Sequence, residues 1–229
     1  MDITLYHCEN ARSLRCLWTL EEMGVKNYKL VTMPFPPRYR HRKFLNTNVL
    51  GTVPFLQDRT ERDQIKTLTE SCAIPYYLVT KYGTPEQQKL IVRPEERDFN
   101  HFLNFMFQAD ATLTFPQTLI LRYTMQEPGK ADKVVSDYTK WYIARLKLLN
   151  HHLADGREFL CCDRFTICDI CITYALFLGT TLKTASGQRI SEKYEPIVAA
   201  YLKRMMSRPS WKAAQRSQAL SARAFRSSL

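Results

Sequence analysis

The pattern of apolar residues changes near Gly83, and this change limits the folds that the chain can adopt. Before it, short runs of alternating apolar and polar residues, typical of strands, lie between helical segments. After it, from about residue 94 to residue 220, the spacing of apolar residues predicts long helices and no strand. The 229 residues suffice for two small domains. The sequence therefore predicts a mixed α/β domain followed by an all-α domain.

The first 83 residues predict the element order β-α-β-α-β-β-α, a small mixed sheet with helices. Pro54 lacks the N–H that a central strand needs, so its strand is expected to start there. Ser71 stands where it could cap the last of these helices. The strands are predicted at residues 3–7, 28–33, 53–56 and 66–68, and the helices at residues 11–24, 39–45 and 72–82.

The first helix follows its strand after a short turn, 8–11, so backbone N–H groups and a positive helix end meet there. Such a point suits an anion, including a thiolate. One face of this helix is predicted to be apolar and the other to stay in water. The apolar set is Leu14, Leu17, Trp18 and Met23, and the set expected in water is Arg12, Arg15, Glu21 and Glu22.

The second part predicts a helix over 93–122, broken at Pro116, and further helices over 131–153, 166–182 and 192–207. Pro209 is expected to stop the last of them. Thr166 and Asp169 have the spacing of a capping box before an apolar run. The predicted domains are 1–83 and 93–229, joined by a linker at 84–92, and the second domain ends in a frayed basic tail from Gln218.

The net charge of +11 raises the question of nucleic-acid binding. The basic residues are scattered through both halves, so we expect a solvated basic surface and no nucleic-acid partner; a positive field that attracts small anionic substrates is the alternative. No apolar run is long enough to span a membrane and no signal peptide is present, so we expect a cytoplasmic protein. The seven cysteines are then expected to be reduced. Cys168 and Cys171 lie in an apolar helical run, which indicates buried thiols and no metal site.

Four motifs, taken in order, resemble those of the cytosolic glutathione transferases over nearly the whole chain. That family joins a thioredoxin-like domain, with a four-stranded mixed sheet, to an all-α domain. The first helix resembles those of bacterial and fungal members, and the class stays open. The motifs are Arg15-x-x-Trp18-x-Leu20-Glu21-Glu22-x-Gly24, Gly51-Thr52-Val53-Pro54-Phe55-Leu56, Leu68-Thr69-Glu70-Ser71-Cys72-Ala73-Ile74 with Tyr77-Leu78, and Phe165-Thr166-Ile167-Cys168-Asp169-Ile170.

The resemblance implies how these residues would hold glutathione as co-substrate, without a metal. Val53 would pair its backbone N–H and C=O with the cysteinyl part, next to a cis peptide bond at the following proline. Ser71 would bind the γ-glutamyl carboxylate and Glu70 the amine. Lys43, or Arg40 near it, is a candidate for the glycine carboxylate. The full predicted set is Arg12, Lys43, Thr52, Val53, Pro54, Glu70 and Ser71.

Three residues compete to stabilise the glutathione thiolate, and the sequence leaves all three open. Many bacterial relatives carry S-R-S-x-R where this chain has Ala11 to Arg15, so the first serine is missing and Ser13 remains. Asn10 stands where several classes place Ser or Cys, and its amide could donate a hydrogen bond. Cys8 begins a C-x-x-A motif similar to that of omega-like transferases, although Glu9 replaces their proline and would raise a thiol pKa.

The leading hypothesis is therefore a glutathione transferase whose thiolate attacks an apolar electrophile. The alternatives are a Cys8-dependent thiol transferase or deglutathionylase, and a non-catalytic ligand-binding module on the same fold. The electrophile is expected between the domains, against the first long helix of the second domain. Family resemblance also implies a homodimer, with residues 73–82 as a contact. The predicted substrate pocket is Phe102, Met106 and Phe107, with Phe105 and Phe115 as further candidates.

Overall fold

The computed structural model describes residues 1–61, 64–126 and 129–227. It divides into two compact units, and the first combines residues 1–88 with the described part of 207–229. The second unit is Lys89–Met206. This division differs from the predicted one, because the last helix belongs with the first unit instead of ending the second.

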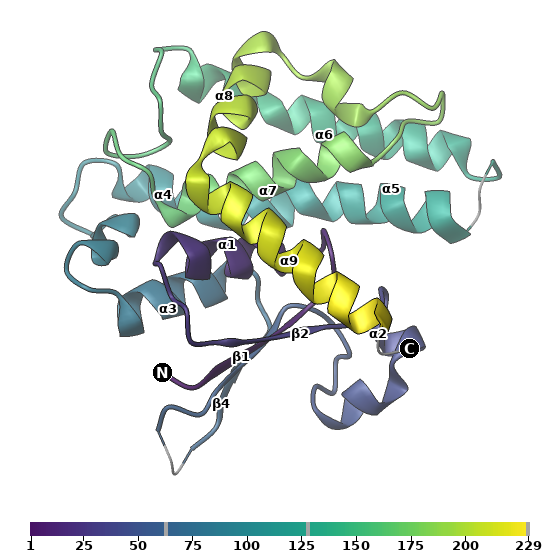
Figure 1. The fold of residues 1–229 in the computed structure, drawn as a ribbon. Coiled ribbons are helices and arrows are strands. Elements are labelled where there is room, and N and C mark those ends of the chain that lie inside the picture. Colours follow the sequence, from purple (N-terminus) through teal and green to yellow (C-terminus); the bar gives the residue numbers. More distant parts are fainter. Residues whose placement is uncertain (62–63, 127–128, 228–229) are drawn as a thin grey trace. The chain divides into compact units, whose positions relative to one another are not determined.

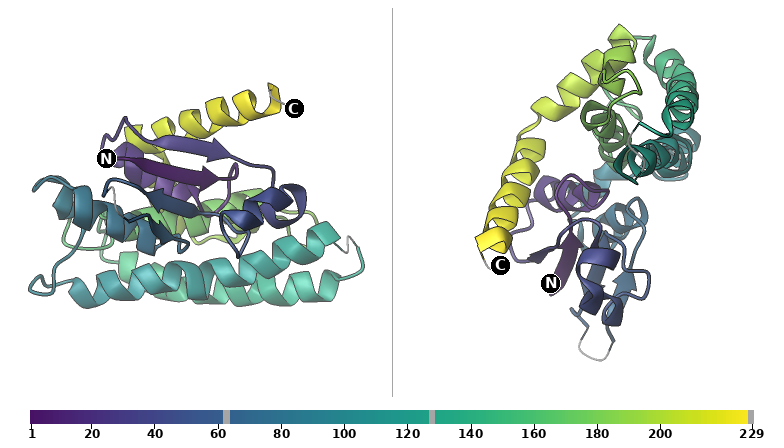
Figure 2. Two further views of the ribbon diagram at one scale, coloured as in Figure 1. Left: turned by 90° about the horizontal axis from the view of Figure 1, so that it is seen from below. Right: turned by 90° about the vertical axis from the view of Figure 1, so that its right-hand side faces the viewer.

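The first unit is built on a mixed four-stranded sheet with the strand order β2-β1-β3-β4 (Figures 1 and 2). The central strand β1 pairs in parallel with β2 and antiparallel with β3, which pairs antiparallel with β4. The predicted mixed sheet is therefore confirmed, with strand ends shifted by one or two residues. The strands are β1 (Ile3–His7), β2 (Lys29–Thr32), β3 (Phe55–Asp58) and β4 (Lys66–Leu68).

The predicted short helix around residues 39–45 is divided into α2 (Pro37–Arg40) and the 3₁₀ turn η1 (Arg42–Asn46). The Phe35–Pro36 and Val53–Pro54 peptide bonds are both cis, and the second was expected. The other helices of this unit are α1 (Leu14–Glu22), α3 (Ala73–Tyr82) and α9 (Pro209–Ser227), and the 3₁₀ turn η2 (Gln87–Leu90) lies at the boundary of the two units.

Helix α1 is buried from Leu14 through Leu20, on every side of the helix. The expectation that Arg15 lies in water is therefore wrong, since its side chain is fully buried. The reason is that α1 contacts α3, α9 and β1, so several faces of this short helix are covered at once. Glu21 and Glu22, also expected in water, are only half-exposed.

The predicted frayed tail is wrong, because residues 209–227 form the continuous helix α9; residues 228–229 lie outside the described residues. Pro209 begins this helix instead of stopping the previous one, a position where the missing proline N–H costs no hydrogen bond. Figure 1 shows α9, in yellow, running beside α1, and the helix also contacts β2. Its buried residues Trp211, Ala214, Gln218 and Ala222 form one stripe along the helix.

Polar and aromatic contacts fix the beginning of α9 to α1. The Trp18 indole N–H donates to Ser210 at 2.9 Å, and the rings of Trp18 and Trp211 meet edge to face with centroids 4.9 Å apart. Arg208 pairs with Glu22 at 2.6 Å. These partners are close to two hundred residues apart along the chain, so no local pattern could indicate them.

The second unit is helical, and its order is α4 (Phe99–Phe107), η3 (Gln108–Thr114), α5 (Phe115–Gln126), α6 (Asp132–Leu153), α7 (Ile167–Thr181), η4 (Ile190–Lys193) and α8 (Pro196–Ser207). The predicted break at Pro116 is displaced, because the interruption is the π-helical segment η3 and Pro116 lies in the first turn of α5. None of the described helices combines the length and the apolar character that crossing a lipid bilayer requires.

The capping box predicted at the start of α7 is present. Both oxygens of the buried Asp169 carboxylate are used, since Oδ2 accepts from the Thr166 N–H at 2.9 Å and Oδ1 from the Leu160 N–H at 3.0 Å. The Tyr201 hydroxyl of α8 also donates to Oδ1, at 2.8 Å. One carboxylate thus connects a loop and two helices of the second unit.

We expect Asp169→Ala to lower the free energy of unfolding by about 3 kcal/mol, because it leaves several buried donors without an acceptor. The control is Asp137→Ala, which removes an exposed carboxylate paired with Lys133 on α6 and should lower the free energy of unfolding far less. Urea unfolding followed by circular dichroism measures both changes. Equal effects of the two substitutions would contradict this role of Asp169.

Candidate active site

The turn between β1 and α1 holds the three candidates for contact with a thiolate. The backbone closes this turn through a hydrogen bond from the Ala11 N–H to the Cys8 carbonyl at 3.1 Å. Asn10 has a left-handed conformation, with φ of 57°, which asparagine tolerates better than most residues. The turn therefore lifts Asn10 off the end of the strand while Cys8 and Ser13 stay on its inner side.

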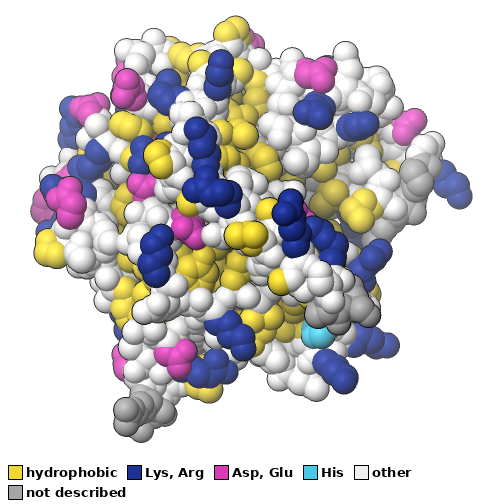
Figure 3. Space-filling view, viewed as in Figure 1, with side chains coloured by type: hydrophobic (Ala, Val, Ile, Leu, Met, Phe, Trp, Pro, Cys, Tyr) yellow, Lys and Arg dark blue, Asp and Glu magenta, His cyan; other side chains and the backbone are white. Residues whose placement is uncertain are grey.

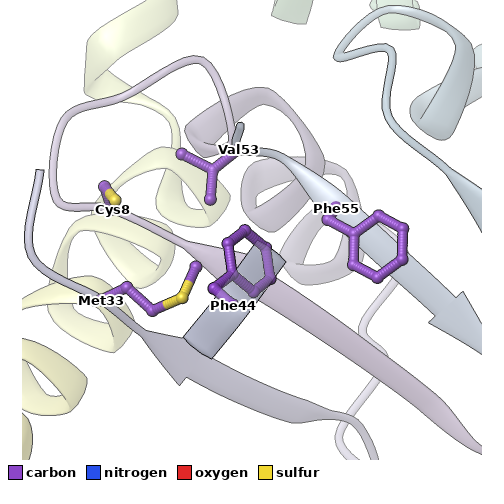
Figure 4. Packing of buried hydrophobic residues seen from close by; sticks show 5 residues of the cluster. All are labelled: Cys8, Met33, Phe44, Val53 and Phe55. Atoms are coloured by element: carbon purple, nitrogen blue, oxygen red, sulfur yellow. The ribbon is translucent and has the colours of Figure 1, made fainter. Parts of the chain in front are cut away.

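Cys8 lies in the core of the first unit, fully buried beside Met33 and Val53 (Figure 4). Its thiol hydrogen bonds to the Pro34 carbonyl over 3.7 Å. Burial raises the pKa of Cys8 to about 12. A thiol in this environment stays protonated at neutral pH and is a poor nucleophile.

Ser13 is also fully buried. Its hydroxyl lies 2.8 Å from Nδ1 of His7 and close to the backbone of Cys8, which donates an N–H to it at 3.4 Å. The other nitrogen of His7, Nε2, has no well-aligned hydrogen-bond partner among the described residues. Burial lowers the pKa of His7 to about 4, an effect that the nearby Gln218 opposes. Ser13 and His7 thus form a neutral pair that packs beneath the turn.

Asn10 is exposed, in contrast to Cys8 and Ser13. Gln218 of α9 accepts a hydrogen bond from the Asn10 backbone N–H at 3.1 Å and donates one to its side-chain oxygen at 3.0 Å. Sequence reasoning missed Gln218. A signal for it was present, because Gln218 is the one polar residue on the stripe of α9 that also holds Trp211, Ala214 and Ala222.

Val53, after the glycine turn and before the cis proline, turns its side chain into the same apolar cluster as Cys8. Among the residues that the structure describes, none forms a hydrogen bond with the backbone N–H or C=O of Val53. Thr52, next to it, is half-buried and its carbonyl accepts from Asn48 at 3.0 Å. This short segment therefore offers an extended ligand two backbone groups of the kind that a paired strand uses.

Ser71 is buried, and Nη1 of Arg15 donates to its hydroxyl at 2.6 Å. Because the oxygen accepts this bond, the hydroxyl proton can still be donated to an incoming carboxylate. The expected cap is wrong, since α3 begins at Ala73 and Cys72 is the residue before it. The sequence placed Arg15 in a motif and among the residues expected in water, and did not indicate this contact. The contact puts a buried cation beside Ser71, the residue that follows Glu70.

The other residues predicted for the site differ widely in their exposure to solvent. Lys43 and Arg40 are exposed on η1 and α2, and Arg12 is half-buried. In the second unit, Phe102 and Met106 are buried in its core, whereas Phe107 is 74% exposed. Their contact with a substrate stays a prediction.

The cysteine pair of the second unit lies inside α7, where Cys168 and Cys171 are both fully buried. Among the described residues, no group of three or more His, Cys, Asp or Glu side chains is arranged to hold a metal ion.

Lys and Arg side chains are spread over the face of the molecule seen in Figure 3, singly and in small groups.

Comparison with known proteins gives the family. A sequence profile described as glutathione S-transferase, N-terminal domain, matches residues 1–80, and the one described as glutathione S-transferase, C-terminal domain, matches residues 115–209. The chain belongs to the glutathione S-transferase family. A curated relative of this family, glutathione S-transferase 3 of Schizosaccharomyces pombe, is 26% identical over 224 residues, which cover 91% of this chain and 84% of the relative.

Solved structures of other glutathione S-transferases share the fold. One is glutathione transferase URE2P6 from Phanerochaete chrysosporium in complex with oxidized glutathione, at 23% identity and a TM-score of 0.78, covering 96% of this chain and 97% of that one. Another is a sphingomonad glutathione S-transferase complexed with glutathione, at 22% identity and a TM-score of 0.75, covering 95% and 99%. At these identities the likeness confirms the predicted fold class but does not assign roles to individual residues.

The buried, neutral His7 makes this transferase-family protein sensitive to acid. The unfolded chain takes up a proton on His7 below a pH of about 6.5, whereas the folded protein does so only near pH 4. Since the unfolded state then binds more protons, stability falls as the pH is lowered through this window, by about 3 kcal/mol in total. Urea titrations at several pH values should give a shallower dependence for His7→Gln than for the unchanged protein; parallel curves would contradict this.

The Cys8 thiol is expected to resist alkylation in the folded protein, because it is buried and protonated. Iodoacetamide at neutral pH followed by peptide mass spectrometry should find Cys8 unmodified, and modified after unfolding in urea. Rapid labelling of Cys8 in the folded protein would show instead that the thiol is accessible.

Proposed function

We propose that the protein is a glutathione transferase in which Asn10 stabilises the glutathione thiolate for attack on an apolar electrophile. The observation that carries this proposal is the contrast within the turn after β1. Asn10 is exposed, whereas Cys8 and Ser13 are fully buried and engaged with the protein interior. A sulfur atom brought to the N-terminal end of α1 can therefore meet the amide of Asn10 before either of the other candidates.

The fit of glutathione to the first unit supports this proposal. The cysteinyl part can pair with the backbone N–H and C=O of Val53, which have no partner among the described residues. The γ-glutamyl carboxylate can accept the hydroxyl proton of Ser71, beside the buried guanidinium of Arg15. The amine then comes close to Glu70, and the glycine carboxylate can reach the cations Lys43 and Arg40 on the exposed side.

The reaction follows from the chemistry of a thiol in this position. Free thiols titrate near ~8.5, so the site must favour the thiolate at neutral pH. The NH₂ group of Asn10 donates to the sulfur and the positive end of α1 adds to its stabilisation. The thiol proton leaves to solvent, the sulfur forms a bond to the electrophilic carbon, and the leaving group departs with its electron pair. Exposed apolar surface in the second unit, such as Phe107, is consistent with an apolar co-substrate.

A Cys8-dependent thiol transferase is the weaker alternative. A mixed disulfide requires Cys8 to attack as a thiolate, and burial raises its pKa to about 12. A non-catalytic ligand-binding module is the other alternative. The backbone groups of Val53 would hold a ligand in such a module as well as in an enzyme, so they do not distinguish the two.

We further propose a homodimer with α3 as a contact, because Tyr76 on this helix is 45% exposed.

Asn10→Ala tests the proposed function directly. We expect it to raise the pKa of the bound glutathione thiol by about one unit and to lower kcat about tenfold, because one charge-assisted hydrogen bond is lost. The dissociation constant of glutathione should change little, since its carboxylates and backbone groups bind elsewhere. Ultraviolet absorbance of the thiolate across pH gives the pKa, and conjugation of a chlorinated nitrobenzene gives kcat.

Cys8→Ala is the matched comparison in the same turn, and it should retain conjugation. Loss of thiol transfer with Cys8→Ala, together with unchanged kinetics in Asn10→Ala, would support the alternative enzyme. Glutathione binding by the unchanged protein without any turnover would support the binding module, and failure to bind glutathione would contradict both enzymes.

A further inference from the structure

Gln218 is the residue of α9 that reaches the candidate active-site turn most directly. It is only 2% exposed, and it bonds to both the backbone N–H and the side-chain oxygen of Asn10. These two residues are 208 positions apart in the sequence. Two hydrogen bonds from one amide to one residue fix that residue more firmly than either bond alone.

The orientation of the Gln218 amide is itself determined by its neighbours. Its Nε2 donates one hydrogen to Asn10 and the other to Oε1 of Gln215 at 2.7 Å, while its Oε1 accepts the Asn10 backbone N–H. Both donors of the amide are thus used, and its oxygen has an N–H in front of it. If the amide were turned over, its oxygen would face two other oxygens, Oε1 of Gln215 and Oδ1 of Asn10. Its NH₂ group would face the backbone N–H of Asn10, so all three hydrogen bonds would be lost.

This arrangement has a consequence for the side chain of Asn10. An asparagine amide has a donor end and an acceptor end, and only the donor end favours a thiolate. Gln218 binds the acceptor end. It also holds the backbone of Asn10 in its left-handed conformation, with φ of 57°.

We infer that Gln218 is a positioning residue, which binds the backbone N–H and the side-chain oxygen of Asn10 so that the NH₂ group faces the glutathione sulfur. This inference rests on the proposed function, because it assigns Gln218 a part in the same thiolate site. Without Gln218, the Asn10 amide can turn its oxygen towards the sulfur, where the partial negative charge of the oxygen would repel the thiolate.

Neighbouring contacts of α9 allow the positioning role to be separated from simple docking of the helix. Ser217 donates to Glu21 at 2.7 Å, and Ser221 lies 2.6 Å from Thr32 by their hydroxyl oxygens. Both serines attach the same helix to the first unit on either side of Gln218, and neither is bonded to Asn10. Ser217→Ala and Ser221→Ala are therefore matched controls for loss of a docking contact.

The experiment compares Gln218→Met, which keeps the length of the side chain without its hydrogen bonds, with Gln218→Glu. The second change keeps an acceptor for the Asn10 N–H but removes the donor, and a carboxylate attracts the Asn10 NH₂ group inwards. We expect Gln218→Met to raise the pKa of bound glutathione by about one unit and to lower kcat about tenfold. Gln218→Glu should lose at least as much, while the glutathione dissociation constant stays within about twofold in both.

A double-mutant cycle identifies the route of the effect. In an Asn10→Ala background, Gln218→Met should change kcat and thiol pKa little, because the residue through which Gln218 acts is already removed. An equal loss in both backgrounds would overturn the inference, as would a kcat and a thiol pKa unchanged by Gln218→Met. A matching loss of kcat in Ser217→Ala and Ser221→Ala would also overturn it, since helix docking would then be the cause.

Amide hydrogen exchange at Asn10 provides a readout that needs no glutathione. Gln218→Met should speed the exchange of the Asn10 backbone N–H at least tenfold, whereas Ser217→Ala should leave it within about twofold. Unchanged exchange in Gln218→Met would overturn the inference on its own. If the unchanged protein binds no glutathione, the proposed function fails and the assignment of Gln218 to a thiolate site fails with it, and the exchange result then shows whether the contact with Asn10 itself exists.

Discussion

The packing of α9 on α1 is the constraint on which the first unit depends. Helix α1 buries seven consecutive residues, more than one face of a helix can supply, so it must be covered from several directions. The sheet and α3 cover part of it, and α9 covers a further part through its buried stripe, which begins at Trp211. A short helix enclosed in this way holds both of its ends firmly, and the candidate active-site turn is the segment that leads into it.

Enclosure of α1 also gives its charged side chains defined roles. Arg15, with no exposed surface, donates to Ser71 at 2.6 Å and so connects α1 to the segment before α3. Glu21 and Glu22 accept hydrogen bonds from Ser217 and Arg208 at the two sides of the helix junction. The same helix thus carries polar contacts to the segment at Ser71 and to α9, and it follows directly after the turn that holds Asn10.

The parts of the structure that could be predicted from the sequence depend on neighbours close along the chain. The strands follow from alternation, the start of β3 directly after Pro54 from the missing N–H of proline, and the capping box at Thr166 from a three-residue spacing. Burial of Arg15 and docking of α9 could not be predicted in this way, because each depends on partners far away in the sequence. Pro209 illustrates the limit, since a proline after one helix can equally be the first residue of the next. Cys8, Ser13 and Asn10 stayed open for a related reason: their residue types allow all three, and the burial of Cys8 and Ser13 depends on the surrounding fold.

The first unit combines two segments that are separated in the sequence by the whole second unit. This arrangement sets the order in which the first unit can fold during synthesis. Residues 1–88 leave the ribosome before the second unit, and residues 207–227 follow it. Domains otherwise tend to fold as soon as they are synthesised. Here the sheet can assemble early, but α1 stays uncovered on one side and Asn10 lacks Gln218 until the last helix has emerged. The contact between Asn10 and Gln218 therefore forms only after α9 has been synthesised.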